Sequence, residues 1–426
     1  MKQSVLMIAF HYPPFSGSSG VQRTLRFSMY LPDHNWQPLV LSAHHRAYEN
    51  VSKDLLGQIP NNVIYKPAFA MDSARHLSFK QKHLQMLAIP DRWITWLFGA
   101  VPSGVKLVKA YKPKCIWSTY PIATAHLIGY CLKKLTKLPW VADFRDPMVE
   151  QNPLTKEWTP KDRAVRRSRL WIERKTIENA SRVIFCTEGA KNICQQRYPD
   201  ADHSTWIVIP NGYDEETFVE VEKLLTKTKG GAAICPTKPF KLLHSGVLYN
   251  SPDRHPKNLF EAVSNLKSSG KIADGDFIIS LRATGFDAEY KQLVASLGIS
   301  NFVEFLPSIP YTQALREMME MDGLLIFQGY TSNPAIPAKL YEYFRAKKPI
   351  FALADELGDT AKLLRSLGLD NIVPLDDTSQ IEEGLSRFLT NLAEDKQTCL
   401  PQDKINLFSR KNQAATLANV LNSLNG

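Results

Sequence analysis

The chain has 426 residues, which is too long for one compact core, so two or three domains are expected. Hydrophobic residues make up 44% and charged residues 22%, and this composition excludes a largely disordered chain. The net charge of +10 suggests an anionic partner, either a phosphate-bearing substrate or an anionic membrane surface, and a charge that serves solubility alone is the alternative. Nucleic acid is not expected as a partner, because there is no zinc-finger spacing, RNP-like motif or dense Lys/Arg stripe.

The six cysteines are scattered and none forms a C-x-x-C pair, so neither a metal site nor a redox motif is expected. Unpaired thiols in a large chain favour a reducing compartment. The apolar run at residues 1–10 is too short for a signal peptide, and no run approaches the ~18 residues that span a bilayer. We therefore expect a cytoplasmic protein, with peripheral contact at the inner face of the cell membrane left open.

The first half of the chain alternates short apolar runs with helical patterns, beginning with a strand at 4–10 and a helix at 21–31. This alternation predicts a parallel sheet with helices on both faces. The charged segment 163–179 has helical periodicity, with a predicted apolar stripe of Leu170, Trp171, Ile172 and Ile177. Further strands are expected at 38–42, 63–65, 115–118, 140–144 and 182–187.

A second alternating series follows a Lys- and Thr-rich segment that contains Gly230 and Gly231, which we interpret as a linker at 216–239. The predicted architecture is α/β, with two doubly wound, Rossmann-like domains at 1–215 and 240–402. A last helix within 403–426 is expected to pack back on the first domain. The second series has predicted helices at 258–266, 288–297 and 339–346 and predicted strands at 241–244, 277–281, 303–305, 324–327, 350–352 and 372–374.

In open parallel sheets, ligands bind at the carboxyl ends of the strands. The loops that directly follow predicted strands are therefore the first candidates for a ligand-binding site. The loop after the first strand contains Gly17 and Gly20 directly ahead of a helix. Small residues there let backbone N–H groups approach a phosphate, and the helix N-terminus favours negative charge. A simple flexible turn is the alternative interpretation.

The segment Asp143-Phe-Arg145-Asp146-Pro ends another predicted strand. Asp143 or Asp146 is a candidate to orient an acceptor hydroxyl or to act as its base. Arg145 is a candidate phosphate ligand. The alternative is an internal ion pair followed by a proline turn.

Three further strand ends carry candidate ligand-binding residues. Asn211 and Gly212 form a tight-turn signal. His244 precedes Gly246, whose missing side chain suits the close approach of a ligand. Arg254, near the start of the next helix, is placed to neutralise a diphosphate, although a solvated arginine is the usual case.

The segment 330–350 joins a strand, a loop and a helix that begins near Pro337. Lys339 and Glu342 are three residues apart and share one face of this helix. A carboxylate at this place can hold a ribose diol, because it accepts two hydrogen bonds. A surface ion pair between the two side chains is the alternative.

Together these motifs resemble the GT-B retaining glycosyltransferases of family 4, the group-1 type. The resemblance rests on Val141-Ala-Asp-Phe-Arg-Asp-Pro147, Val208-Ile-Pro-Asn-Gly-Tyr-Asp214, Leu243-His-Ser-Gly246, Ile336-Pro-Ala-Lys-Leu-Tyr-Glu-Tyr343 and the loop that ends in Gly20-Val-Gln-Arg23. It covers nearly the whole chain. It implies transfer of a sugar from a nucleotide-diphosphate sugar, with retention and without a metal or other cofactor, to a glycan or lipid-linked acceptor in bacterial surface polysaccharide synthesis.

By the same resemblance, the donor lies mostly in the second domain and the acceptor mostly in the first. Gly20 then approaches the donor diphosphate, Arg254 takes the place of a diphosphate-binding lysine, and Glu342 matches the second Glu of an E-x7-E motif. The first Glu of that motif falls at Pro334, so its contact is lost or moved to Asn333. An arginine of the family is replaced by Val247.

Two other functions stay open at this point. One is a nucleotide-sugar epimerase on the same fold, and the other is a non-catalytic subunit that stabilises a partner transferase, which the loss at Pro334 favours. The stretch 80–114 mixes lysines with Trp93, Trp96, Leu97 and Phe98, a pattern that suits a membrane interface. An ordinary core helix with lysines outside is the alternative.

Overall fold

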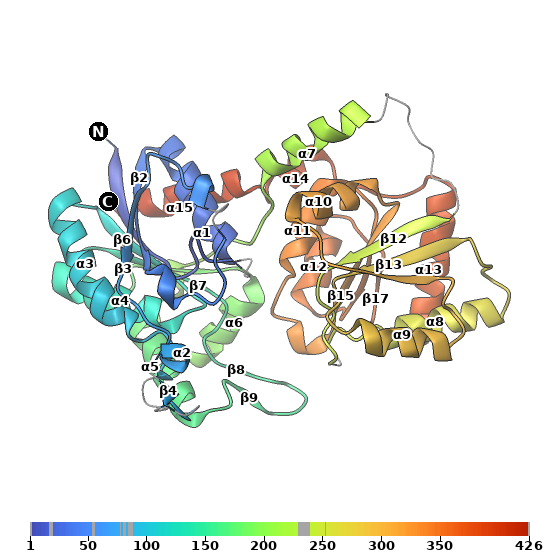
Figure 1. Ribbon diagram of the computed structural model, residues 1–426, viewed down its shortest axis with the longest axis horizontal. Coiled ribbons are helices and arrows are strands. Elements are labelled where there is room, and N and C mark those ends of the chain that lie inside the picture. Colours follow the sequence, from blue (N-terminus) through green and yellow to red (C-terminus); the bar gives the residue numbers. More distant parts are fainter. Residues whose placement is uncertain are drawn as a thin grey trace. The chain divides into compact units, whose positions relative to one another are not determined.

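The computed structural model describes residues 2–16, 20–52, 56–76, 78–79, 82–83, 88–228, 239–251 and 253–424. The chain folds as two compact units, the first made of Met1–Asn211 with Arg410–Gly426 and the second of Gly212–Ser409 (Figure 1). Each unit is a parallel sheet covered by helices on both faces, which confirms the predicted α/β class.

The sheet of the first unit has the strand order β11-β10-β7-β6-β1-β2-β3, and all its pairs are parallel. Continuous apolar runs form these strands because both faces are buried. The strands are β1 (Gln3–Ile8), β2 (Trp36–Ala43), β3 (Ile64–Ala68), β6 (Cys115–Thr119), β7 (Trp140–Arg145), β10 (Arg182–Phe185) and β11 (Trp206–Val208).

Two helices cover one face of this sheet and four cover the other. On the first face, α1 (Gly20–Tyr30) packs against α15 (Arg410–Asn422), so the last helix of the chain lies on the first unit (Figure 1). Trp36 in β2 donates a 2.9 Å hydrogen bond from Nε1 to Oδ1 of Asn422. The second face carries α3 (Trp96–Tyr111), α4 (Ala123–Thr136), α5 (Arg163–Asn179) and α6 (Glu188–Arg197).

Short elements complete the first unit. They are the helix α2 (Ser73–His76) and the antiparallel pairs β4 (Ser78–Phe79) with β5 (Lys82–His83) and β8 (Glu150–Gln151) with β9 (Trp158–Thr159).

The predicted apolar stripe of helix 163–179 is wrong at Trp171, which is 48% exposed. The buried face of α5 instead contains Ile172, Glu173 and Thr176. The Glu173 carboxylate is buried because it accepts hydrogen bonds from the Met148 backbone N–H at 2.8 Å and the Arg197 guanidinium at 2.5 Å. A buried charge is stable only when it is paired in this way.

The sheet of the second unit has the order β14-β13-β12-β15-β16-β17, again with parallel pairs. Its strands are β12 (Phe240–Ser245), β13 (Phe277–Arg282), β14 (Val303–Leu306), β15 (Gly323–Gln328), β16 (Ile350–Ala354) and β17 (Ile372–Val373). One face is covered by α8 (Lys257–Ser268), α9 (Asp287–Ser296) and α13 (Thr378–Ala393). The other carries α7 (Glu215–Thr228), α10 (Tyr311–Glu320), α11 (Ala338–Ala346), α12 (Asp359–Ser366) and α14 (Gln402–Asn406).

Helix α7 occupies much of the segment that the sequence analysis interpreted as a linker, and residues 229–238 of that segment lie outside the described residues. The buried Arg345 guanidinium donates hydrogen bonds of 2.7–3.1 Å to the carboxylates of Glu215 and Glu222 on one face of α7. Phe218 and Val221 are buried on the same helix. The helical spacing of these residues was hidden by a composition rich in Lys and Thr.

Candidate functional site

Each sheet has one point at which the strand order reverses, and in open α/β sheets ligands bind at the carboxyl ends beside such a point. In the first unit, the reversal lies between β1 and β6: the strand order runs through β2 and β3 on the β1 side, and through β7, β10 and β11 on the β6 side. In the second unit, the reversal lies between β12 and β15. The candidate residues can therefore be judged by their distance from these two strand pairs.

In the second unit, His244 and Lys339 meet at the β12–β15 pair. His244 is the second-last residue of β12, and its Nδ1 lies 2.9 Å from the Leu325 carbonyl oxygen of β15. A carbonyl only accepts, so Nδ1 carries the proton and Nε2 is a free acceptor. The Lys339 Nζ lies 3.1 Å from that Nε2 and donates to it. Two residues 95 positions apart thus form one polar pair.

Burial sets the protonation of this pair. Burial, together with the charges of Lys339 and Arg254, holds the pKa of His244 well below its usual value, so the imidazole is neutral. Burial and the Arg254 charge lower the pKa of Lys339 to about 7, although the Glu342 carboxylate opposes this effect. The amine therefore titrates close to neutral pH.

Gly246 follows β12 with φ of +118°, a backbone conformation that residues with a side chain rarely adopt. A Cβ at this position would lie 2.9 Å from the Lys339 Nζ. The glycine therefore does two things: it permits the turn after β12, and it leaves the space beside the amine unfilled.

Arg254 lies at the same pair of strand ends. Its guanidinium donates a 3.1 Å hydrogen bond to Oε1 of Gln328, the last residue of β15. Asp253 lies 3.6 Å from the Arg254 Nε, and its carboxylate also accepts from Thr331 Oγ1 at 2.7 Å and from Ser332 Oγ. Arg254 is thus a positioned cation and not the solvated arginine of the alternative interpretation.

Glu342 lies in the first turns of α11 and accepts a 2.8 Å hydrogen bond from the Tyr311 hydroxyl. Tyr311 begins α10, and nothing in the sequence pattern connects it to Glu342. The Asn333 Nδ2 donates a 3.0 Å hydrogen bond to Oδ1 of Asp355, which directly follows β16. Its Oδ1 is buried without a hydrogen-bond partner, so Asn333 keeps a polar atom available near this edge.

In the first unit, Asp143 is fully buried and forms a bidentate ion pair with Arg23 of α1, at 2.8 and 2.9 Å. Arg23 also donates to the carbonyl oxygens of Ile209 and Pro210, both at 3.0 Å. Thr119 Oγ1 donates to the same carboxylate at 2.8 Å. Asp143 therefore has the internal ion-pair role that the sequence left as the alternative, and it is not placed to take a proton from a substrate.

Arg145 and Asp146 lie at the carboxyl end of β7. Arg145 has φ of +63°, which is uncommon for a residue with a side chain and points to a local constraint. Burial raises the pKa of Asp146, and the charges of Arg145 and Arg23 oppose this effect. His11 follows β1, and burial with the Arg145 charge lowers its pKa to about 4, so it is neutral at pH 7.

The remaining predicted residues are placed as follows. Gly20 is buried and begins α1 beside the β1–β6 reversal, whereas Gly17 lies outside the described residues. Asn211 ends the first segment of the first unit, and its carbonyl accepts a 2.7 Å hydrogen bond from Gln413. Gly212 begins the second unit.

Comparison with known proteins adds to this geometry. Residues 68–212 match the family model described as a glycosyl transferase 4-like domain. No curated protein sequence matches the chain significantly. Sucrose-phosphate synthase from Thermosynechococcus elongatus superposes with a TM-score of 0.64 at 13% identity, over 99% of each chain.

Two further solved structures have the same fold. HepE from Anabaena, in complex with UDP and glucose, has a TM-score of 0.62 at 15% identity, over 99% of this chain and 100% of the other. The lipopolysaccharide outer core galactosyltransferase WaaB has a TM-score of 0.62 at 13% identity, over 99% of each chain. The chain therefore has the GT-B fold, and its residues 68–212 are similar to the glycosyl transferase 4-like domain. UDP-GlcNAc 2-epimerase from Neisseria meningitidis also superposes, with a TM-score of 0.56 at 14% identity, over 99% of this chain and 100% of the other.

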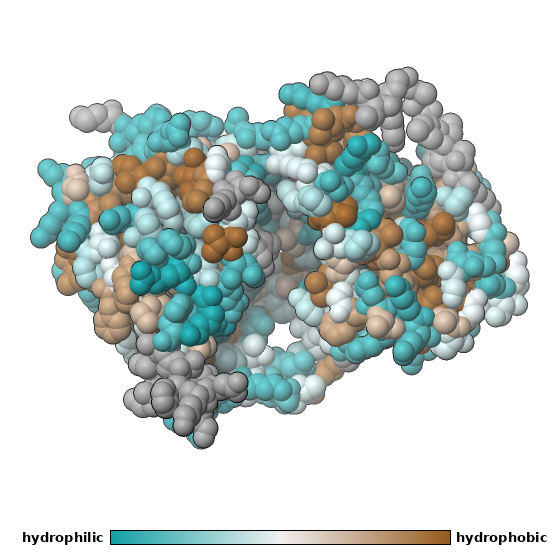
Figure 2. Space-filling model, viewed as in Figure 1, coloured by the Kyte–Doolittle hydropathy of each residue, from teal (hydrophilic) through white to brown (hydrophobic). Residues whose placement is uncertain are grey.

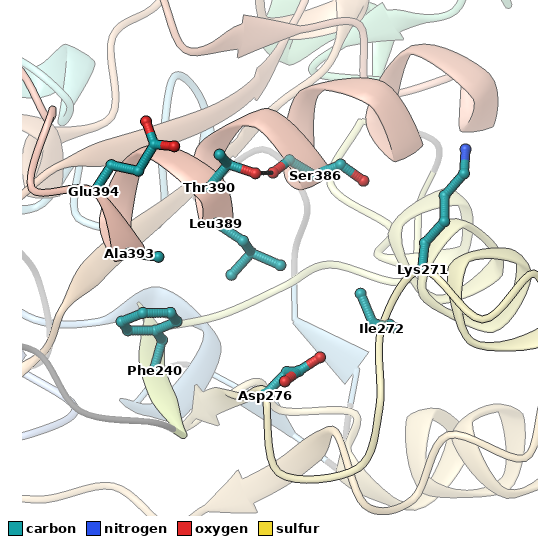
Figure 3. Close-up of a pocket in the computed structure, with 9 residues that line it drawn as sticks. All are labelled: Phe240, Lys271, Ile272, Asp276, Ser386, Leu389, Thr390, Ala393 and Glu394. Atoms are coloured by element: carbon teal, nitrogen blue, oxygen red, sulfur yellow. Dashed lines mark hydrogen bonds between the residues drawn. The ribbon is translucent and has the colours of Figure 1, made fainter.

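The GT-B chain also has a cavity of about 430 Å³ in its second unit (Figure 3). Its lining includes Phe240 at the start of β12 and Asp276 just before β13, together with side chains of α13. The cavity therefore lies at the amino ends of the strands, the edge opposite His244 and Gly246. By the strand-end rule it is not the donor site.

Sequence reasoning missed three residues that the GT-B fold brings to the carboxyl edges. Gln328 binds Arg254, Tyr311 binds Glu342, and His11 follows β1. Gln328 is the last residue of β15 and His11 lies three residues after β1, so a polar residue close to a strand end was a usable signal. Tyr311 begins a helix and gave no such signal. Among the described residues of this GT-B chain, no cluster of three or more His, Cys, Asp or Glu side chains is placed to hold a metal ion.

The Arg23–Asp143 pair gives a prediction that separates a structural role from a catalytic one. Removing one partner leaves an uncompensated buried charge, which costs about 3–5 kcal/mol. We expect Arg23→Met and Asp143→Leu each to lower the free energy of unfolding of the GT-B chain by that order. The double variant should be destabilised by less than the sum of the two, as measured by urea denaturation. Unchanged stability in both single variants would contradict the structural role.

Proposed function

We propose that this chain is a glycosyltransferase that moves a sugar from a nucleotide-diphosphate sugar to a glycan or lipid-linked acceptor. The observation that carries the proposal is the group of Arg254, Lys339 and Glu342 beside Gly246 at the β12–β15 reversal. Two basic groups match a diphosphate, the glycine leaves room for it, and the carboxylate matches a ribose diol. The complexes of HepE with UDP and glucose, on the same fold, support a nucleotide-sugar donor.

The chemistry follows from these charges. When the bond between the sugar and the diphosphate breaks, negative charge develops on the leaving phosphate oxygen. Arg254 and Lys339 are fixed in place before the reaction, so they stabilise that charge without reorganisation. The nucleotide sugar is a substrate, and the proposal needs neither a metal nor another cofactor.

We assign the acceptor to the first unit and retention to the reaction. Asp146 at the carboxyl end of β7 is the group that we propose as a base or orienting ligand for the acceptor hydroxyl, and Arg145 assists beside it. Burial raises the pKa of Asp146, which makes its carboxylate a stronger base. A same-face route requires no protein nucleophile, and Asp143 is excluded because both its oxygens bind Arg23.

We place the enzyme in the cytoplasm, in bacterial surface polysaccharide synthesis. The shared fold with a lipopolysaccharide galactosyltransferase supports this assignment. Two alternatives have specific support. Pro334 in place of a motif Glu favours a non-catalytic subunit, and the shared fold with UDP-GlcNAc 2-epimerase supports an epimerase.

Donor binding is tested by a thermal-shift screen of UDP-, GDP-, ADP- and CMP-sugars on the wild type and on Glu342→Gln. At a ligand concentration of 100 Kd, binding stabilises the native state by about 2.7 kcal/mol, which raises the Tm of a unit of this size by about 5 °C or more. We expect one nucleotide class to produce this shift and Glu342→Gln to lose most of it.

The control is Glu394→Gln, which removes a carboxylate at the opposite, amino edge of the same sheet (Figure 3). This variant should keep the full shift. The donor-site assignment would fail if the wild type responded to no nucleotide sugar, or if Glu342→Gln responded as fully as the control.

Membrane contact is a further part of the proposal. No helix among the described residues has the length and apolarity that a membrane crossing requires. Residues 92–142 contain no Asp or Glu but eight Lys and Arg residues. In this stretch α3 and α4 pack together, with Phe98 72% and Leu135 63% exposed. Figure 2 shows such apolar residues interspersed with hydrophilic ones over the first unit. We name Lys133, Lys134, Leu135 and Lys137 the α4 basic end.

The membrane segment expected from sequence is corrected at Trp96, which is fully buried in the core and so cannot enter lipid. The exposed α4 basic end is the better candidate, since each lysine near an anionic surface contributes about 1 kcal/mol. The alternative is that these lysines only complement the helix C-terminus.

Sedimentation with vesicles of anionic lipid at low salt tests this contact. We expect the wild type to bind, and a triple variant Lys133→Glu, Lys134→Glu, Lys137→Glu to bind at least tenfold more weakly, because about 3 kcal/mol of attraction is lost. A control with the same change in net charge, Lys223→Glu, Lys271→Glu, Lys362→Glu in the second unit, should bind like the wild type. Equal loss in both variants would point to net charge alone and contradict a specific surface.

A further inference from the structure

The Lys339–His244 pair is unusual because the lysine has a neutral partner. Among the described residues, Lys339 forms no ion pair within 4 Å, and its Nζ instead donates to the His244 Nε2 at 3.1 Å. Buried lysines are normally paired with a carboxylate. An amine held by a neutral imidazole loses its proton more easily than one paired with a carboxylate, and an anion that binds beside it favours the charged form.

The imidazole fixes the position of the amine. The His244 Nδ1–H is bound to the Leu325 carbonyl at 2.9 Å, so the ring cannot turn over without losing that bond. His244 also packs edge-on to Phe327, with 5.0 Å between the ring centroids. The Lys339 Nζ is therefore aimed at one place, beside the space that Gly246 leaves open.

The other charges around this amine come from three elements. The loop after β12 contributes Arg254, whose charge disfavours the ammonium, and Asp253, which is occupied by Thr331 and Ser332. On α11, Glu342 favours the ammonium, and it accepts a hydrogen bond from Tyr311 of α10. The Tyr343 hydroxyl of α11 accepts from the Ser245 backbone N–H at 3.1 Å, and burial raises its pKa, so it stays neutral. Arg254 therefore lowers the pKa of Lys339, and Glu342 opposes that effect.

We propose that Lys339 is a proton-coupled ligand of the donor diphosphate: the amine is largely uncharged in the free protein above neutral pH and takes up a proton when the diphosphate binds beside Gly246. This inference rests on the proposed donor site and adds to it a residue role and a pH dependence. Arg254 is charged at all relevant pH values and supplies the constant part of the attraction, whereas Lys339 supplies the part that varies.

The direction of the pH dependence follows from linkage. Burial lowers the pKa of Lys339 to about 7 in the free protein, and a bound dianion raises it again. Donor affinity is therefore highest below pH 7 and falls as the pH rises from 7 toward the higher pKa of the bound state. In that interval, binding takes up protons from the buffer. The terminal phosphate of a nucleoside diphosphate, with a pKa of about 6, contributes little at pH 8.

Calorimetric titration at pH 8 in two buffers of different ionisation enthalpy measures this proton uptake directly. The probes are UDP, GDP and inorganic pyrophosphate. For the wild type we expect uptake of about one proton per bound probe and an affinity that falls severalfold between pH 6.5 and pH 8.5. For Lys339→Arg, which keeps a permanent charge, we expect binding with no proton uptake and little pH dependence.

Lys339→Met should bind at least about tenfold more weakly than the wild type at pH 6.5 and should also lose the uptake. Lys362→Met, which removes an exposed lysine of the same unit, should keep both. Wild-type binding without proton uptake, or unaltered uptake in Lys339→Met, would overturn this inference alone. Binding of none of the three probes to the wild type would overturn the proposed donor site and this inference together.

Discussion

The parallel arrangement of both sheets is the constraint on which the rest of this structure depends. Parallel strands place all their carboxyl ends at one edge, and the reversal of strand order leaves an uncovered place there. In the second unit, that place brings together residues from β12, its following loop, β15 and α11, although they are up to 95 positions apart. The chemistry of the chain is thus decided by which side chains stand at these few strand ends.

The two units use charge differently. In the first, Arg23 and Asp143 satisfy each other completely and tie α1 to β7 and to the carbonyls of Ile209 and Pro210. This pair fixes the fold beside the β1–β6 reversal, and Arg145 and Asp146 are the residues there that we propose for the acceptor. In the second, Lys339 donates to the neutral His244 and forms no ion pair among the described residues, so its amine can take up a proton when an anion binds. A charge that is already paired stabilises structure, whereas one that lacks a counter-charge is suited to binding.

Much of the fold was predictable from the sequence, because strands buried on both faces read as continuous apolar runs. All the strands expected in the two halves form, and helix α5 begins and ends at the predicted residues 163 and 179. The errors at Trp171 and in the linker have one cause, namely that buried polar contacts decided the structure. Glu173 pairs with Arg197 on α6, and Arg345 pairs with Glu215 on α7. Pairs between different helices cannot be predicted from the local sequence pattern.

The candidate site was predictable to a similar depth. The strand-end rule selected His244, Gly246, Arg254 and Lys339, and the structure places all four at the β12–β15 reversal. The strand-end rule did not reveal that Asp143 pairs with Arg23, 120 residues earlier in the chain, or that Tyr311 donates a hydrogen bond to Glu342. The sequence also does not show the His244 tautomer or the Lys339 protonation state, because the Lys339 pKa depends on burial and on the charges of Arg254 and Glu342.

The central claim is that this chain transfers sugars. The most direct test incubates the purified protein with a radiolabelled nucleotide sugar and a lipid extract of its source, and follows the label and the anomeric configuration of the product. We predict label in an acceptor, with the configuration of the donor retained. Label that stays in a converted nucleotide sugar would identify an epimerase, and binding without any turnover would identify a non-catalytic subunit; either result would contradict the account.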